Sequence, residues 1–178
     1  MFKAVNDSRI QMSELMLPSY TNFGGKIHGG YILSLMDQIA FACASKHSGS
    51  YCVTASVDKV NFLNPIEVGE LVTMKASINY VGTSSMVVGI RVESENIRTG
   101  KKKHCNSSYF TMVAIDENGK TAQVPGLRLD SKIDAKRFIK AIKRQESESK
   151  KNKALSSVYK NVSDHLDLLQ NYRVRVDF

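Results

Sequence analysis

Alternation of apolar and polar residues dominates the middle of the chain. Every second residue is apolar in the stretches 70–80 and 84–94, and the stretch 107–116 continues this pattern. A period of two residues predicts strands that turn one face towards a core. Residues 51–62 alternate as well, but their phase changes, so we expect a strand with a bulge or bend near Asp58. Residues 9–17 form a further predicted strand, which Pro18 closes.

One long helix precedes most of these strands. Apolar residues recur every three or four positions from Gly29 or Gly30 to about Lys46, and Gly49 follows as a helix stop. The helix is apolar over much of its circumference, so we expect other elements to wrap it. One helix followed by about four consecutive strands predicts an α+β fold in which an antiparallel sheet curls around the helix. The free edges of such a sheet favour pairing of two subunits across a twofold axis.

The last part of the chain differs in charge and pattern. The formal charge of the 178-residue chain is +8, and residues 128–178 hold +6 of it, with 13 basic and 7 acidic side chains. We predict a short amphipathic helix over 131–142 and then a polar stretch, 145–153, that is a solvated linker or helix. Apolar residues then recur at spacings of three or four and predict a helix that packs on a partner surface; they are Leu155, Val158, Val162, Leu166 and Leu169.

Composition narrows the class of protein. No run approaches the ~18 consecutive apolar residues of a membrane span, and the N-terminus lacks the apolar segment of a signal peptide, so we expect a cytoplasmic location. The three cysteines, Cys43, Cys52 and Cys105, are an odd number without the spacing of metal ligands. We therefore expect buried, reduced thiols and no metal site.

A cysteine nucleophile is an alternative that the helix suggests. Cys43 and His47 are four residues apart, so their side chains can meet on one helix face. They lie near the C-terminal end of the helix, however, where the helix dipole disfavours a thiolate. We therefore do not expect this pair to be catalytic.

The start of the predicted helix carries the strongest candidate chemistry. The loop Thr21–His28 leads into Gly29 and Gly30, and glycine there lets another group approach the main chain closely. Free amide groups and the positive end of the helix dipole suit a partly negative oxygen. Asp37 follows Gly30 by seven residues, hence on the same side two turns later. The helix therefore aims oxyanion donors and a carboxylate towards one cleft.

These motifs and three later ones resemble the hotdog-fold acyl-coenzyme A thioesterases. The resemblance covers residues about 9–126, roughly two thirds of the chain. Its blocks are Asn22–Gly30 running into Leu35–Asp37, then Val53–Asp58 with Asn61-Phe62, Val81–Ser85 and Phe110–Gly119. The four blocks occur in the expected order, which makes the match specific.

The resemblance implies a fold, an assembly and a division of the chain. It implies a hotdog fold, with a long central helix wrapped by a curved antiparallel sheet, over residues 8–127. Residues 128–178 are then a basic, helical C-terminal extension outside the match. Two subunits would join their sheets edge to edge, with active sites at the dimer interface, and three such dimers commonly form a hexamer. Each site would take Asn22 from one subunit and Asp37 from the other.

The resemblance also implies roles for individual residues. Asp37 would act as general base or as nucleophile on a fatty acyl-coenzyme A thioester, and Asn22 would orient the water or the carbonyl. The N–H of Gly30, or of its neighbour, would hold the oxyanion. We expect coenzyme A and acyl contacts from His28, Gly29, Gly82, Thr83, Ser84 and Ser85. The reaction needs no separate cofactor, since coenzyme A belongs to the substrate and the product.

Several positions have a plainer interpretation. Ser84 and Ser85 are also suited to a hairpin tip, and the run Lys101–Lys103 suits a solvated hairpin turn better than a phosphate site. Relatives often carry an acidic residue two places before the loop asparagine, where this chain has Tyr20. That difference weakens any role for the position and bears on which acyl groups enter.

Three other functions compete with thioester hydrolysis. A non-catalytic acyl-coenzyme A sensor would bind the ligand without needing Asp37. A hotdog dehydratase or hydratase would need a His–Pro–Gly context, which the sequence does not contain. Nucleic-acid binding through the basic tail is disfavoured, because acidic residues interleave with its lysines and no reader motif is present.

Overall fold

The computed structural model describes residues 1–160 and 162–175. The chain divides into two compact units, Met1–Phe138 and Ile139–Phe178, which are described separately. The predicted limits of the hotdog domain, 8–127, remain a prediction. Among the described residues, no helix is long and apolar enough to cross a membrane.

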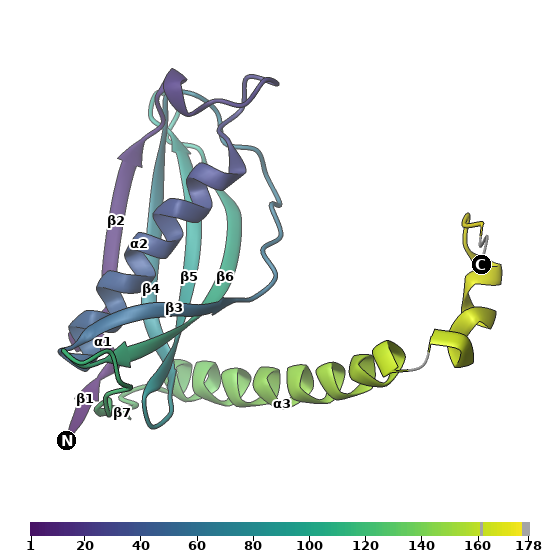
Figure 1. Ribbon diagram of the computed structural model, residues 1–178. Helices are drawn as coiled ribbons and strands as arrows, with labels where there is room; N and C mark the ends of the chain where they lie inside the picture. The colour runs from purple at the N-terminus through teal and green to yellow at the C-terminus, as the bar shows by residue number, and fades with distance from the viewer. Residues whose placement is uncertain (161, 176–178) are drawn as a thin grey trace. The chain divides into compact units, whose positions relative to one another are not determined.

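The first unit is built on a five-stranded antiparallel sheet. Its strands are β2 (Ile10–Leu15), β3 (Tyr51–Val57), β4 (Glu70–Val81), β5 (Ser85–Asn96) and β6 (Lys102–Ile115). They lie in the order β2-β4-β5-β6-β3, so β2 and β3 are the edges. This arrangement confirms the predicted curled antiparallel sheet and the α+β class (Figure 1).

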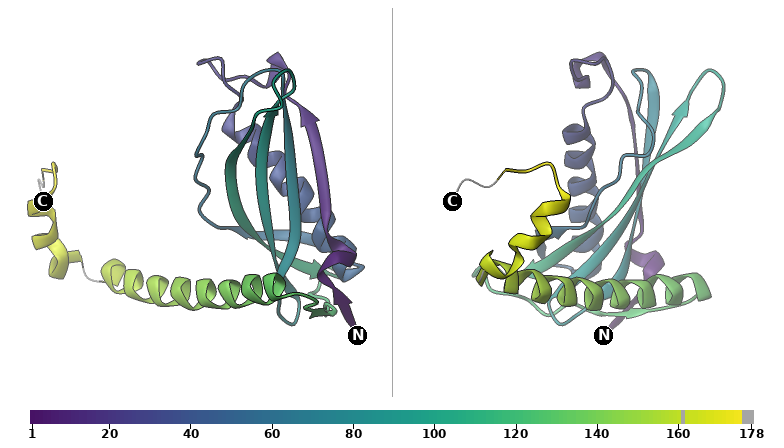
Figure 2. Two further views of the ribbon diagram at one scale, coloured as in Figure 1. Left: turned by 180° about the vertical axis from the view of Figure 1, so that it is seen from behind. Right: turned by 90° about the vertical axis from the view of Figure 1, so that its right-hand side faces the viewer.

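The long helix α2 (Gly29–Ser48) lies against one face of the sheet (Figure 2). It ends at Gly49, whose φ of 75° is the left-handed conformation that glycine adopts readily. Its buried residues follow helical spacing: Ile32, Leu35, Met36, Ile39, Ala40, Cys43, Ala44 and His47. They pack on the inward-facing residues of three strands, among them Met74, Val88 and Phe110.

The helix is covered less completely than its composition indicates. Ser34, Asp37, Gln38 and Phe41 are exposed, so one side of α2 faces outward in this chain. Sequence periodicity counts apolar residues, and it does not distinguish burial within a chain from burial against a partner. Asp37 therefore lies outside the core of its own subunit.

The edge strand β3 differs from its predicted form. The strand ends at Val57, and its irregularity lies between Thr54 and Ser56, so the bulge predicted near Asp58 is misplaced. The change of phase at Asp58 instead marks the point where the chain leaves the sheet. Residues 58–69 cross beside α2 without regular structure, and Leu63 N–H donates to Cys105 O at 2.8 Å.

A second, small sheet ties the N-terminus to the chain that follows β6. Strand β1 (Phe2–Ala4) pairs in parallel with β7 (Gly126–Arg128), and the one-turn helix α1 (Val5–Ser8) follows β1. A Cβ at Gly126 would lie 2.5 Å from the ring of the exposed Phe2, so this ring would have to shift to admit a side chain there. These elements were not predicted, because three-residue strands carry no periodicity.

The tail is more helical than predicted. Helix α3 (Lys132–Lys160) begins in the first unit and runs unbroken through the predicted end at 142 and through the polar stretch 145–153. The predicted helix over Leu155–Leu169 is wrong in its bounds, because α3 ends at Lys160 and a 3-10 helix, Val162–Asn171, follows residue 161, which lies outside the described residues.

Candidate active site

The loop before α2 places Asn22 in a tight turn. Its side-chain Oδ1 accepts hydrogen bonds from the backbone N–H of Gly24 at 2.9 Å and of Lys26 at 3.2 Å. The turn also closes through its backbone, where Asn22 N–H donates to Lys26 O at 2.8 Å. The side-chain oxygen of Asn22 therefore forms hydrogen bonds within the loop, and the exposed Nδ2 group is the part that can contact a substrate.

The helix start is capped by His28. Its Nδ1 accepts the N–H of Gly30 at 2.9 Å, so the neutral ring carries its proton on Nε2. The predicted oxyanion donor, Gly30, is thus engaged in this structure. The N–H of Gly29 has no partner among the described residues, which makes it the available amide of this turn. Gly29 also lets the Phe62 ring lie over the helix start, since a Cβ there would be 3.2 Å from that ring.

Asp37 meets a residue that the sequence analysis did not single out. The hydroxyl of Thr54, on β3, donates to Asp37 Oδ1 at 2.5 Å. The hydroxyl therefore fixes one oxygen of the Asp37 side chain against β3. Oδ2 of Asp37 has no hydrogen-bond partner among the described residues, so it faces outward with a free acceptor.

One chain does not bring all the predicted residues together. Seven residues of helix separate Gly30 from Asp37, which corresponds to about 10 Å along the axis. A single carbonyl group cannot contact both in the same subunit. The predicted convergence of the two on one cleft therefore does not occur within one chain.

The predicted coenzyme A loop lies elsewhere in the sheet. Gly82, Thr83, Ser84 and Ser85 turn between β4 and β5, with Gly82 N–H donating to Ser85 O at 2.8 Å. This turn lies at the end of the sheet opposite the start of α2 (Figure 1). It is the hairpin tip that the plainer interpretation predicts, and Thr83 O accepts Val124 N–H at 2.9 Å.

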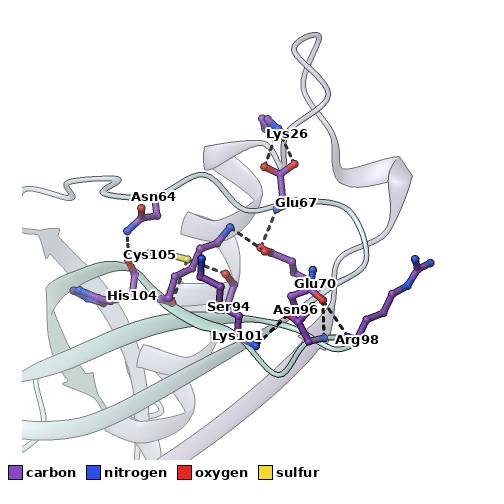
Figure 3. Close-up of polar contacts among 12 residues, drawn as sticks. Lys26, Asn64, Glu67, Glu70, Ser94, Asn96, Arg98, Lys101, His104 and Cys105 are labelled. Carbon is purple, nitrogen blue, oxygen red and sulfur yellow. Dashed lines mark hydrogen bonds and ion pairs between the residues drawn. The ribbon is translucent and has the colours of Figure 1, made fainter.

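A polar network holds the loops around the start of α2 (Figure 3). Lys26 pairs with Glu67 at 2.7 Å, Glu67 N–H donates to Glu70 at 3.0 Å, and Lys103 pairs with the buried Glu70 at 2.9 Å. Burial disfavours ionisation of Glu70, but the bonds from Lys103, Glu67 and Ser94 outweigh it and lower its pKa. The network links the Asn22 loop to the ends of β4 and β6.

The same network gives the lysine run a structural role. Lys102 pairs with Glu95 at 3.2 Å, and Lys103 is occupied by Glu70. The hairpin itself is closed by Asn96, whose N–H donates to Lys101 O at 2.9 Å and whose Oδ1 accepts the N–H groups of Arg98 and Thr99 (Figure 3). These pairings favour the plainer interpretation of Lys101–Lys103.

Two stacked tyrosines brace the loop against the helix. The rings of Tyr20 and Tyr31 lie 3.9 Å apart at 20°, and the Tyr31 hydroxyl donates to Glu14 on β2. Burial, and then the bond to Glu14, raise the pKa of Tyr31 well above its usual value. Tyr20 O also accepts His28 N–H at 2.8 Å. Tyr20, at the position where relatives often have an acid, therefore packs between the Asn22 turn and the first turn of α2.

The cysteine alternative is not supported by the environment of Cys43. Its side chain is fully buried in the core, and this burial raises the pKa of the thiol to about 12. His47 is also buried, and its Nε2 lies 3.1 Å from Pro125 O rather than on the thiol. A protonated thiol without a base is no nucleophile at neutral pH.

Comparison with known proteins identifies the family to which this hotdog sheet and its capped helix belong. The sequence model of the Thioesterase superfamily matches residues 24–101. The protein VdlD of Helicobacter pylori is 45% identical over 139 residues, which are 78% of this chain and 79% of VdlD. The chain therefore belongs to the Thioesterase superfamily.

Solved structures agree with this assignment. A hexameric acyl-CoA thioesterase matches with a TM-score of 0.82 and 36% identity, over 85% of this chain and 97% of its own. An acyl-CoA hydrolase from Staphylococcus aureus, solved with butyryl coenzyme A and coenzyme A, matches with a TM-score of 0.79 and 29% identity, over 90% and 100% of the two chains.

Variants of the Staphylococcus aureus protein give a further point of similarity. An asparagine, an aspartate and a threonine of that protein have each been replaced by alanine in solved structures. The aspartate follows the asparagine by fifteen positions, and the threonine follows the aspartate by seventeen. Asn22, Asp37 and Thr54 have the same two separations in this chain.

Thr54 is the functional candidate that sequence reasoning missed. It lies inside the block Val53–Asp58 that carries the resemblance, but alternation along a strand does not say which side chain meets the helix. The pairing depends on how α2 crosses β3, which is a tertiary relationship.

Proposed function

We propose that this protein hydrolyses fatty acyl-coenzyme A thioesters to the free acid and coenzyme A. The observation that carries the proposal is the Asp37–Thr54 pair, in which one carboxylate oxygen is held at 2.5 Å and the other is free. An ionised carboxylate with one anchored oxygen is oriented to take a proton from water or to attack a carbonyl carbon.

In the general-base form of the reaction, Asp37 removes a proton from a water molecule. The water oxygen bonds to the thioester carbonyl carbon, and the carbonyl oxygen becomes an oxyanion. A backbone N–H at the start of α2 stabilises this charge, and Gly29 has such a group free. The C–S bond then breaks, and the sulfur of coenzyme A takes up the proton. In the nucleophile form, a carboxylate oxygen of Asp37 bonds to the carbonyl carbon, the C–S bond breaks and coenzyme A leaves as a thiolate. Water then hydrolyses the mixed anhydride to the free acid and the restored Asp37 carboxylate, and the thiolate takes up the proton that this step releases.

The site is proposed to form between two subunits. Asn22 and the start of α2 would come from one subunit, while Asp37 and Thr54 would come from the other, since about 10 Å of helix separates the two groups within a chain. The loop Gly82–Ser85, remote from α2's start in its own subunit, would reach coenzyme A at the shared site.

An exposed apolar edge supports this assembly. Tyr51, Val53 and Val57 on the edge strand β3 are 62%, 38% and 45% exposed, and Phe41 of α2 lies edge-on to Tyr51 at 5.3 Å. Pairing β3 with β3 of a second subunit would cover these residues and satisfy the free strand edge. We propose this dimer as the unit, with three dimers forming a hexamer.

The test is to measure the hydrolysis of a panel of thioesters, from acetyl- to palmitoyl-coenzyme A, by the release of free thiol. Asp37→Asn should abolish turnover and leave coenzyme A binding and the circular dichroism spectrum unchanged. Asp116→Asn, in a remote turn, is the matched control and should hydrolyse normally. Unchanged turnover in Asp37→Asn would reject the mechanism, and tight binding with no turnover by the unmodified protein would support a sensor instead.

A further inference from the structure

A cleft lies on the face of the sheet that α2 does not cover. Its volume is about 800 Å³, which is within the size range of small-molecule sites. The outward-facing residues of β2, β4, β5 and β6 form its floor, and residues 130–137 form one wall. Asp37 and Thr54 lie on the side of the sheet that packs against α2, so this cleft is separate from the proposed active site.

The floor of the cleft carries a buried amide. Asn79 occupies a register shift between β4 and β5 and is only 5% exposed. Its Oδ1 accepts the hydroxyl of Ser77 at 3.2 Å, whereas its Nδ2 has no hydrogen-bond partner among the described residues. Bulges re-aim side chains, and Asn79 lines the cleft at this shift of register. Asn79 therefore offers a donor to a ligand in the cleft.

The neighbouring strand makes room for this amide. Gly89 lies beside Asn79, and a Cβ there would be 2.1 Å from Asn79 Nδ2 and 3.3 Å from the Tyr109 ring. Any larger residue would push the amide out of its position. The absence of a side chain at Gly89 thus keeps the floor open between Asn79 and Tyr109.

The rim of the cleft has more positive than negative charge. Lys75 and Arg91 share the single carboxylate of Glu93, each at 2.8 Å, and these bonds lower the pKa of Glu93 to about 2. Glu93 is thus ionised at neutral pH. Two cations and one carboxylate leave this group with a net charge of +1.

A second group, formed by Arg9 and two wall residues, repeats the arrangement. Arg9 and Arg137 share Asp134, at 3.6 and 4.0 Å. Asp130 of the same wall is paired with Arg128 at 2.9 Å and adds no net charge. Arg91 uses Nε for Glu93, and its two terminal nitrogens have no partner among the described residues. The cleft therefore combines two excess positive charges with a free guanidinium edge and a buried amide donor.

We propose that this outer cleft is a second binding site, for a small molecule that carries at least two phosphate charges. A guanidinium edge binds phosphate oxygens through paired N–H donors, and the Asn79 amide supplies a further donor from the floor. The site is separate from thioester hydrolysis and does not depend on it.

Inorganic pyrophosphate is the probe for this site, titrated calorimetrically into the full-length protein. We expect Arg91→Gln and Arg137→Gln each to weaken binding by about tenfold or more, the loss typical of one charge-assisted hydrogen bond. Asn79→Asp, which adds a negative charge to the floor, should weaken it as well. Lys120→Gln, at an exposed turn outside the cleft, is the matched control and should bind as the unmodified protein does.

Each other result would overturn the proposal. No binding by the unmodified protein would remove the site, and equal weakening in Lys120→Gln would show unspecific attraction to the basic surface. Equally tight binding of malonate would reject phosphate as the ligand class. Loss of binding in Asn22→Ala would place the pyrophosphate in the active site, and the hydrolysis assay on that variant keeps the two proposals distinct.

Discussion

Thr54 donates to Asp37 across the junction between β3 and α2, at 2.5 Å. This bond holds the carboxylate in one orientation. We expect Thr54→Val to lower the rate of thioester hydrolysis about tenfold to a hundredfold, the range for one hydrogen bond to a charged group. Thr54→Ser keeps the hydroxyl and is the control. A wild-type rate in Thr54→Val, measured by thiol release, would show that Asp37 needs no anchor.

A shared site predicts rescue between two inactive variants. Asn22→Ala and Asp37→Ala subunits, unfolded together and refolded, should regain about a quarter of the wild-type activity, because random dimers give one intact site in four. The measurement is the rate of thiol release, with heterodimers quantified by two different affinity tags. If mixed dimers form and remain inactive, both residues belong to a site within one subunit.

The stacked pair Tyr20 and Tyr31 allows the contribution of the Tyr31–Glu14 hydrogen bond to be measured separately from that of ring packing. Tyr31→Phe keeps the stack on Tyr20 but removes the bond to Glu14, so the free energy of unfolding should fall by about 1 kcal/mol. Urea denaturation measures this difference. Glu14→Gln still offers an acceptor to the Tyr31 hydroxyl and should lose less stability, and an equal loss in that variant would contradict the role given to the Glu14 bond.

Because His47 is buried, we expect the free energy of unfolding to fall below neutral pH. The pKa of His47 is lower than its ordinary value, chiefly because the side chain is buried. The bond to Pro125 O and the charge of Asp7 oppose this shift, whereas the charge of Lys3 adds to it. The unfolded chain then binds more protons than the folded one as the pH falls through about 6.5, so the free energy of unfolding falls there.

The measurement is urea denaturation at about pH 7.5 and about pH 5.5, a window above the ordinary carboxylate range. His47→Gln has no ring to protonate and should lose less stability between the two pH values than the unmodified protein. An equal loss in both proteins would mean that His47 does not titrate in this window.

The cap on α2 predicts that His28 acts through the helix rather than on the substrate. His28→Ala should lower the free energy of unfolding by about 1 kcal/mol, the usual cost of removing an N-cap, whereas His28→Asn can still accept the N–H of Gly30. Denaturation of both variants tests the cap. If His28→Asn is as stable as wild type but inactive, His28 has a direct catalytic role.

The long elements could be predicted from the sequence because each has one face in a common core. Strands β4 and β5 begin and end within a few residues of their predicted bounds, and α2 ends at Gly49 as expected. In contrast, β1 and β7 are three residues each and form only by pairing with each other across more than a hundred residues. No local pattern indicates such a pairing.

The candidate site divides in the same way. The glycine-led helix start and Asp37 are visible as residue types at fixed spacing, and the family match gives them roles. The spacing of residues does not specify side-chain rotamers. It therefore could not predict that His28 Nδ1 accepts the N–H of Gly30, or that Asn22 Oδ1 accepts the N–H of Gly24 within the loop.

By itself, the order of residues in this chain determined the helix, the succession of strands and the family, because hydrophobic periodicity and short motifs are local properties. Only the tertiary structure decided that Asp37 faces outward against Thr54, that about 10 Å of helix separates it from Gly30, and that the opposite face of the sheet holds a polar cleft. These facts follow from how α2 crosses the sheet and how neighbouring strands align, which are contacts between residues far apart in the chain.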